Sequence, residues 1–319
     1  MYSLTSTQAL SRNDIHIILN RAQEYLEHDN FPTLCGKVAI LFIEPSTRTN
    51  LSFQMSAQQL GLQVLNFSPD NSSFIKGESL QDTLETLAAM GVDIAVIRAK
   101  GDWPAMVDTN NLPIRLINAG SGVHEHPTQA LLDALTIRQE FHDFTNLKVT
   151  IVGDVLHSRV ARSNFDILTK LGAKVQFAGP PEFACEGVVS LAPWVDFDEA
   201  LLDSDVVMML RIQHERHQEG LVINKEEYHR RYGLTSARVA KMKKSAIIMH
   251  PGPVNRDVEI ASEVIHYPQS RILTQVRNGV AIRMALLEKC LMEDYYEQLV
   301  STEWSYISKR KITATSFAH

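Results

Sequence analysis

The stretch KVAILFIEPSTRTNLSF, residues 37–53, contains a strand, a loop and the start of a helix in direct succession. Its first seven residues form a short apolar run, which is typical of a strand buried on both faces. From residue 48 to residue 60 the pattern becomes amphipathic with a helical period, and Gly61 follows as a stop signal. The order of strand, polar loop and helix predicts an α/β protein.

The same alternation continues along most of the chain. Further apolar runs occupy residues 62–67, 92–99, 114–120, 147–154, 174–180, 205–212 and 245–251. Helical patterns lie between them, as at residues 78–90 and 127–141, and this order favours mainly parallel sheets flanked by helices. The helix at 127–141 follows the fourth run and precedes the fifth, so the eight runs separate into two groups.

We therefore expect two α/β domains, residues 1–140 and 141–279, with the ligand site in the cleft between them. In open parallel sheets, ligands bind at the carboxyl ends of the strands. A last helix, from about Gly279 or residue 280 to Leu299, is expected to pack back on the first domain, and residues 300–319 are expected to form a peripheral tail.

Composition narrows the class of protein. The 319 residues are 45% hydrophobic and 21% charged, which is typical of a globular protein, and the formal net charge of −6 disfavours a general nucleic-acid binder. The three cysteines show no CxxC spacing, and no apolar run is long enough to cross a bilayer. We expect a cytoplasmic protein that has no membrane anchor and no nucleic-acid partner.

A cluster of hydroxyls and one guanidinium directly follows the first strand. Ser46, Thr47, Arg48 and Thr49 stand where the following helix would begin. Main-chain N–H groups at a helix start, together with these side chains, would form a cradle for an oxyanion. One of the hydroxyls could instead serve as an ordinary N-cap, but a cap does not account for three hydroxyls and an arginine.

Other strand ends carry chemically related groups. Arg98, Arg159 and Arg211 each lie at or just after a predicted strand, as do HPTQ at 126–129 and HPGP at 250–253. Any one of these could be a salt-bridge partner, a helix start or a turn. Together they predict a site for anionic substrates, because several arginines at one edge concentrate positive potential there.

Metal and nucleotide chemistry find little support in the sequence. The histidine-rich segments at residues 124–126 and 214–217 match no HExxH spacing, and no third ligand is evident. The chain has neither GxxxxGK[ST] nor GxGxxG. We expect no metal and no cofactor.

Six motifs taken together resemble one family. They are STRT at 46–49, KGES at 76–79, HPTQ at 126–129, GDVLHSRVARSN at 153–164, LRIQHER at 210–216 and HPGPVNRDVEI at 250–260. In this order they resemble the catalytic chains of the aspartate carbamoyltransferase family, over about residues 4–295. The resemblance implies transfer of the carbamoyl group from carbamoyl phosphate to the amine of L-aspartate, the committed step of pyrimidine biosynthesis. It also implies that residues 1–140 bind carbamoyl phosphate and residues 141–279 bind aspartate.

The resemblance also implies roles for individual residues. For carbamoyl phosphate it implies Ser46, Thr47, Arg48, Thr49, Arg98, His126, Gln129, Pro251 and Gly252. For aspartate it implies Lys76, Arg159, Arg211 and Gln213, and as catalytic groups Arg48, Thr49, Lys76, Arg98 and His126. Ser72 and Lys76 are expected to enter the site of a neighbouring subunit in a homotrimer, which could stand alone or join regulatory or dihydroorotase-like chains.

Two other functions stay open at this level. A carbamoyltransferase for another amine would share the phosphate cradle, but ornithine enzymes of the superfamily carry HCLP and DxxxSMG segments where this chain has HPGP and LRIQ. Arginine and glutamine suit a dicarboxylate better than a cationic amine. A non-catalytic homologue that binds anionic metabolites would be expected to lack cradle or clamp residues, and this chain keeps them.

Overall fold

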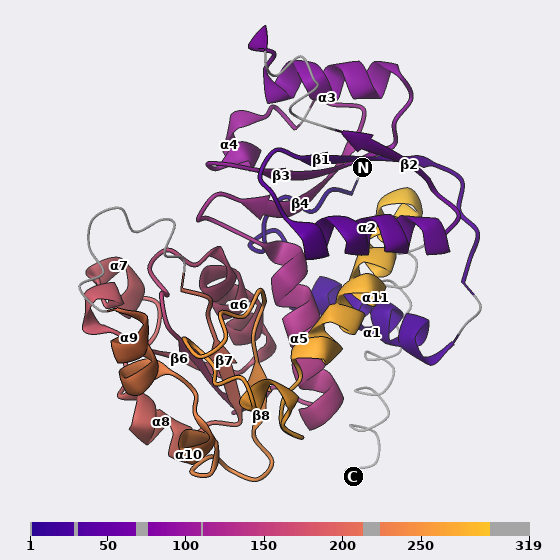
Figure 1. Cartoon of the computed structure of the whole chain (residues 1–319). Coiled ribbons are helices and arrows are strands. Elements are labelled where there is room, and N and C mark those ends of the chain that lie inside the picture. Colours follow the sequence, from indigo (N-terminus) through magenta and orange to yellow (C-terminus); the bar gives the residue numbers. More distant parts are fainter. Residues whose placement is uncertain (1, 29–30, 68–75, 110, 213–223, 294–319) are drawn as a thin grey trace, which may run out of the picture.

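The computed structural model describes residues 2–28, 31–67, 76–109, 111–212 and 224–293. Within these residues the chain forms two four-stranded sheets, each parallel throughout and flanked by helices (Figure 1). The predicted fold class is confirmed. Ser72, Gln213, the histidine-rich segment 214–217 and the tail 300–319 lie outside the described residues.

The first sheet has the strand order β2-β1-β3-β4. Its strands are β1 (Lys37–Phe42), β2 (Gln63–Phe67), β3 (Ile94–Ala99) and β4 (Arg115–Ser121). The helices before and between them are α1 (Arg12–Glu27), α2 (Thr47–Gln59), α3 (Leu80–Ala89) and α4 (Trp103–Met106). The inner strands β1 and β3 are buried almost throughout, whereas β2 lies at the edge and is more exposed. The other edge strand, β4, is as buried as the inner strands.

The second sheet repeats the arrangement, with the order β6-β5-β7-β8. Its strands are β5 (Lys148–Val152), β6 (Lys174–Ala178), β7 (Val206–Met209) and β8 (Ile247–Met249). Its helices are α6 (Arg159–Leu171), α7 (Glu186–Val189), α8 (Phe197–Asp203), α9 (Lys225–Tyr232) and α10 (Ser236–Val239), with 3₁₀ turns η3 (Pro181–Phe183) and η5 (Val264–His266). In both sheets the carboxyl ends of the inner strands open toward the same cleft.

Two predicted helix ends agree with the structure, and one predicted helix start does not. Gly61 and Gly91, with φ of +74° and +76°, follow α2 and α3, where only glycine enters this conformation without strain. The last helix, expected from about Gly279, instead begins at Ile272 and is described to Leu291 as α11 (Ile272–Leu291). Gly279 lies inside this helix, where an added Cβ would come within 3.3 Å of Leu132 and still closer to Arg283, so the glycine serves close packing and not helix initiation.

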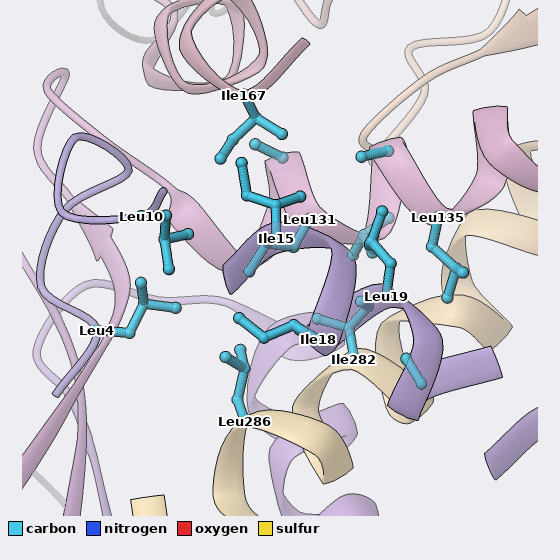
Figure 2. Close-up of a cluster of buried hydrophobic side chains, with 14 of the residues drawn as sticks. Leu4, Leu10, Ile15, Ile18, Leu19, Leu131, Leu135, Ile167, Ile282 and Leu286 are labelled. Atoms are coloured by element: carbon cyan, nitrogen blue, oxygen red, sulfur yellow. The ribbon is translucent and has the colours of Figure 1, made fainter. Parts of the chain in front are cut away.

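Two long helices connect the halves of the molecule. Helix α5 (Pro127–Phe141) leads from the first sheet to the second, and α11 packs against α5, α1 and α2 (Figure 1). Figure 2 shows the apolar side chains that join these helices, among them Ile18 of α1, Leu131 of α5 and Ile282 of α11. Because a single buried cluster contains residues from both halves, the two strand edges that face the cleft are held close together.

No helix in the described part of the chain combines the length and the apolarity that crossing a bilayer requires.

Candidate active site

A cavity of about 800 Å³ receives residues from both sheets at the carboxyl ends of their strands. The predicted residues that line it are Ser46, Thr47, Arg48, Thr49, Arg98, His126, Gln129, Arg159, Arg211, Pro251 and Gly252. Lys76 is exposed and does not line this cavity, while Ser72 and Gln213 lie outside the described residues. The structure thus brings together every described site residue of the prediction except Lys76.

The hydroxyl cluster lies at the start of α2. Ser46 occupies the N-cap position, but its side chain makes no capping hydrogen bond. Residues 46–49 line the cavity at the start of this helix, where the first-turn N–H groups and the positive end of the helix dipole favour an anion. The ordinary cap described as an alternative above does not explain this serine.

Arg48 extends from the first half of the molecule to the second. A Cβ added to Gly252 would lie 2.9 Å from Arg48 Nε, so the guanidinium lies directly against the main chain of the HPGP segment. Burial lowers the pKa of Arg48, and the nearby charge of Arg211 lowers it further. Two like charges that interact across one cavity favour the binding of an anion there.

Glu44 is a site residue that the sequence analysis left without a role. Arg159 Nη1 donates to Glu44 Oε2 at 2.7 Å and to the Gly122 carbonyl at 2.9 Å, and Arg98 Nε lies 3.6 Å from the same carboxylate oxygen. Glu44 belongs to the first half and Arg159 to the second, so this ion pair crosses the cleft. Glu44 directly follows the first strand, and this position could have identified it as a site residue because the carboxyl ends of the strands line the site.

His126 is buried at the start of α5. Its main-chain N–H donates to Ser163 Oγ at 2.8 Å, and among the described residues its Nδ1 has no hydrogen-bond partner. Burial is the main cause that lowers the pKa of His126 well below its usual value, and Arg159, Arg98 and Arg283 add to the effect. The imidazole is therefore neutral at physiological pH, so it carries one N–H donor and one acceptor nitrogen.

Substituting His126 by Asn should change how stability depends on pH. The unfolded histidine takes up a proton at about pH 6.5 while the folded one does so only at lower pH, so its contribution is complete above about pH 6.5 and is lost as the pH falls through the folded-state pKa. We expect the Tm of the wild type, relative to His126→Asn, to be at least about 2 °C higher at about pH 8 than at about pH 5.5. Differential scanning fluorimetry of the two proteins at each pH measures these Tm values. An equal Tm difference at the two pH values would contradict the assignment of a neutral imidazole.

Arg283 of α11 is a second residue that the sequence analysis missed. Its side chain is almost fully buried on the cavity wall, where Nη1 donates to Ser52 Oγ at 2.9 Å and the guanidinium stacks 5.1 Å from the Phe53 ring centroid. Burial lowers its pKa to about 10. The residue was missed because it lies in a helix whose apolar spacing indicated only packing.

The HPGP segment is held by a buried histidine. His250 Nδ1 accepts from the Gly252 N–H at 2.8 Å, so its proton is on Nε2, which lies 3.1 Å from Glu259 Oε1. The Gly252 N–H is therefore used inside the segment, and Pro253 has none to donate. Pro251 and Gly252 line the cavity, and of their main-chain groups only the carbonyls can accept hydrogen bonds.

The charges around the cavity are strongly unequal. Of the described residues that line it, Arg48, Arg98, Arg159, Arg211 and Arg283 are cationic, and Glu44 is the one carboxylate. Such a site, with hydroxyls, main-chain N–H groups and a neutral imidazole, can hold more than one anionic group and can stabilise an oxyanion that forms between them.

Comparisons with known proteins agree with this geometry. The family model of the aspartate/ornithine carbamoyltransferase carbamoyl-P binding domain matches residues 3–139, and that of the Asp/Orn binding domain matches residues 145–290. The aspartate carbamoyltransferase catalytic subunit of Listeria innocua is 45% identical over 305 residues, which are 95% of this chain and 100% of the relative. That of Streptococcus pyogenes serotype M4 is 44% identical over 301 residues, 91% of this chain and 94% of the relative.

Solved structures of Trypanosoma cruzi aspartate transcarbamoylase share the fold. The complex with carbamoyl phosphate superposes with a TM-score of 0.77 at 28% identity, and the complex with N-(phosphonacetyl)-L-aspartic acid with a TM-score of 0.76 at 29% identity. Each comparison covers 89% of this chain and 94% of the other. The matched domains, the similar relatives and the strand-edge cavity lead to one conclusion: the chain belongs to the aspartate/ornithine carbamoyltransferase family.

Proposed function

We propose that this chain is an aspartate carbamoyltransferase, which transfers the carbamoyl group of carbamoyl phosphate to the amine of L-aspartate and gives N-carbamoyl-L-aspartate and phosphate. The observation that carries the proposal is the single cavity in which a helix-start hydroxyl cluster faces arginines from the other sheet. It offers separate anchors for a phosphate and for a dicarboxylate. The reaction would serve pyrimidine biosynthesis in the cytoplasm.

Carbamoyl phosphate would bind mainly to residues 1–140. Ser46, Thr47, Arg48 and Thr49 would hold the phosphate, and Arg98 would contact both the phosphate and the carbonyl oxygen. His126 and Thr49 would donate to that oxygen, for which the neutral imidazole is suited because it carries one N–H. Gln129 and the carbonyls of Pro251 and Gly252 would accept from the carbamoyl NH₂.

Aspartate would bind mainly to residues 141–279. Arg159 and Arg211 line the cavity from the second half, and we assign them to the two carboxylates, together with Gln213. The Arg159 guanidinium already donates to one carboxylate, that of Glu44 on the other side of the cleft, which supports its assignment to a substrate carboxylate. A cationic acceptor such as ornithine would place an ammonium among these arginines, so the geometry favours a dicarboxylate.

The proposed mechanism needs no covalent enzyme intermediate. The aspartate amine attacks the carbonyl carbon, and negative charge develops on the carbonyl oxygen, where Arg98, His126 and Thr49 would stabilise it. The tetrahedral intermediate collapses, the C–O bond to phosphate breaks, and phosphate leaves with the amine proton. The arginines act chiefly by holding two anions at reacting distance in spite of their repulsion.

A complete site would also need a neighbouring subunit. Lys76 does not line the cavity of its own chain and is exposed, which leaves it available to another chain. We propose a homotrimer in which the loop bearing Ser72 and Lys76 enters the adjacent cavity. Such a trimer could act alone or in a larger assembly with regulatory or dihydroorotase-like chains.

A direct assay tests the proposed reaction. The purified chain is incubated with carbamoyl phosphate and with L-aspartate, ornithine or putrescine, and the ureido product is measured by its colour reaction. We expect product with L-aspartate and none above background with the two cationic amines. Product with ornithine or putrescine instead would favour another carbamoyltransferase, and no product with any acceptor would favour a metabolite-binding homologue.

Substitution of Arg211 by Ala should weaken the use of aspartate selectively. The guanidinium is assigned to a substrate carboxylate, and a hydrogen bond to a charged group contributes about 1.5 to 3 kcal/mol. We expect the KM for aspartate to rise by roughly 10- to 150-fold, while the dissociation constant of phosphate changes less than about threefold. Steady-state kinetics and phosphate inhibition measure the two effects, and equal losses toward both substrates would contradict the assignment.

A further inference from the structure

A buried carboxylate lies directly behind the proposed carbamoyl site. Asp133 is one helical turn after Gln129 in α5, is fully buried and does not itself line the cavity. Three side-chain amides donate to it: Gln129 Nε2 to Oδ1 at 2.9 Å, Gln275 Nε2 to Oδ1 at 2.7 Å, and Asn164 Nδ2 to Oδ2 at 2.8 Å. These donors come from α5, α11 and α6, so the carboxylate joins three helices behind the cleft.

The carboxylate determines which way the Gln129 amide faces. An ionised carboxylate only accepts hydrogen bonds, so Gln129 must present its NH₂ to Asp133. The Oε1 atom is then directed away from Asp133, and Gln129 lines the cavity. An NH₂ group on a ligand needs an acceptor, which is what this orientation provides.

The same carboxylate acts on the HPGP segment through Gln275. The Gln275 amide is bound at both ends, because Nε2 donates to Asp133 and Oε1 accepts from the His250 main-chain N–H at 2.9 Å. The two contacts require the same orientation of the amide, because the Asp133 carboxylate accepts only from the NH₂ end and the His250 N–H donates only to Oε1. The main chain before Pro251 and Gly252 therefore depends on the same acceptor as Gln129.

Asp133 is charged at neutral pH in spite of its burial. Burial raises the pKa of Asp133 to about 6, against the lowering effect of the three amides and of the nearby Arg283 charge. Burying a carboxylate among amides contributes little or nothing to folding compared with an apolar or amide replacement. Its place behind the cavity is better explained by the orientation that it imposes.

We propose that Asp133 is a positioning residue that makes the site specific for the carbamoyl group. By holding Gln129 directly and residues 250–252 through Gln275, it presents acceptors to the carbamoyl NH₂ and so distinguishes carbamoyl phosphate from acyl phosphates that carry a methyl group there. This inference rests on the proposed function. It differs from a purely structural role, in which Asp133 would only hold α5, α6 and α11 together.

The test compares Asp133→Asn with the wild type, using acetyl phosphate as the probe. The substitution keeps the volume but puts an NH₂ where a carboxylate oxygen accepted, so at least one of the three amides must turn or lose its bond. We expect the ratio of the acetyl phosphate Ki to the carbamoyl phosphate KM to fall by about tenfold, the size of one or two hydrogen bonds. The Ki of acetyl phosphate itself should change less than about threefold.

Thr136→Val is the matched control. Thr136 is fully buried one turn further along α5 and accepts from Asn278 Nδ2 of α11 at 2.9 Å, away from the cavity. Loss of the Thr136 hydroxyl weakens the contact between α5 and α11 but leaves the hydrogen bonds of Asp133 in place. The ratio of the acetyl phosphate Ki to the carbamoyl phosphate KM should therefore equal that of the wild type.

Each outcome decides the inference. A wild-type ratio in Asp133→Asn, or equal weakening toward carbamoyl phosphate, acetyl phosphate and phosphate, would overturn it. If Asp133→Asn does not fold, Gln275→Met tests the link from Asp133 to the main chain of His250. An unchanged ratio in Gln275→Met would also overturn the inference. Failure of the proposed function is distinguishable, because then the wild type itself would form no carbamoyl-aspartate.

Discussion

Substitution of Arg48 by Ala is expected to abolish most of the activity while the protein stays folded. Arg48 is the one full positive charge within residues 46–49, and its guanidinium extends across the cleft to the main chain of Gly252. Removing a preorganised charged contact of this kind costs about 2 to 4 kcal/mol of transition-state stabilisation. The expected loss in kcat/KM for carbamoyl phosphate is therefore roughly 30- to 1000-fold.

The loss should come from the phosphate and not from unfolding. Arg48 side-chain packing contributes little to the core, so the Tm should stay within about 2 °C of the wild type. Arg230→Ala is the control, because this exposed arginine pairs with Glu227 on α9, far from the cavity, and surface ion pairs contribute about 0 to 1 kcal/mol. A kcat/KM for Arg48→Ala within a fewfold of the wild type would refute the cradle assignment.

Mixing two inactive variants is expected to restore activity if Lys76 serves the neighbouring cavity. Lys76→Ala and Arg48→Ala would each be nearly inactive alone. In a cyclic trimer each site takes Arg48 from one chain and Lys76 from the next, so equal mixing and refolding makes about one quarter of all sites free of both lesions. We therefore expect about one quarter of wild-type activity in the mixed sample.

The matched control mixes Arg48→Ala with Arg98→Ala. Both residues line the cavity of the same chain, so every site in any mixed trimer carries a lesion and no activity should return. Sedimentation verifies that trimers form in both mixtures. Recovery with Lys76→Ala no greater than the sum of the separate variants would refute the shared site.

Local pattern was sufficient for the fold class and for most of the candidate site. The apolar runs predicted all eight strands, and the inner strands β1 and β3 are apolar almost throughout because both of their faces are buried. The rule that ligands bind at the carboxyl ends of parallel strands then pointed to Arg48, Arg98, Arg159 and Arg211, and the structure places all four around one cavity. These features depend on periodicity and position along the chain, which the sequence contains directly.

Only the tertiary structure decided which distant groups meet. Glu44 pairs with Arg159, and Asp133 accepts from Gln275 across 142 positions of sequence, because the helices and sheets bring them together. Arg283 donates to Ser52 from a helix whose spacing indicated only packing, and its side chain lies so close to Gly279 that an added Cβ would not fit there. A buried charge is tolerated only where its partners converge, and that convergence is a property of packing between remote segments, which no local period encodes.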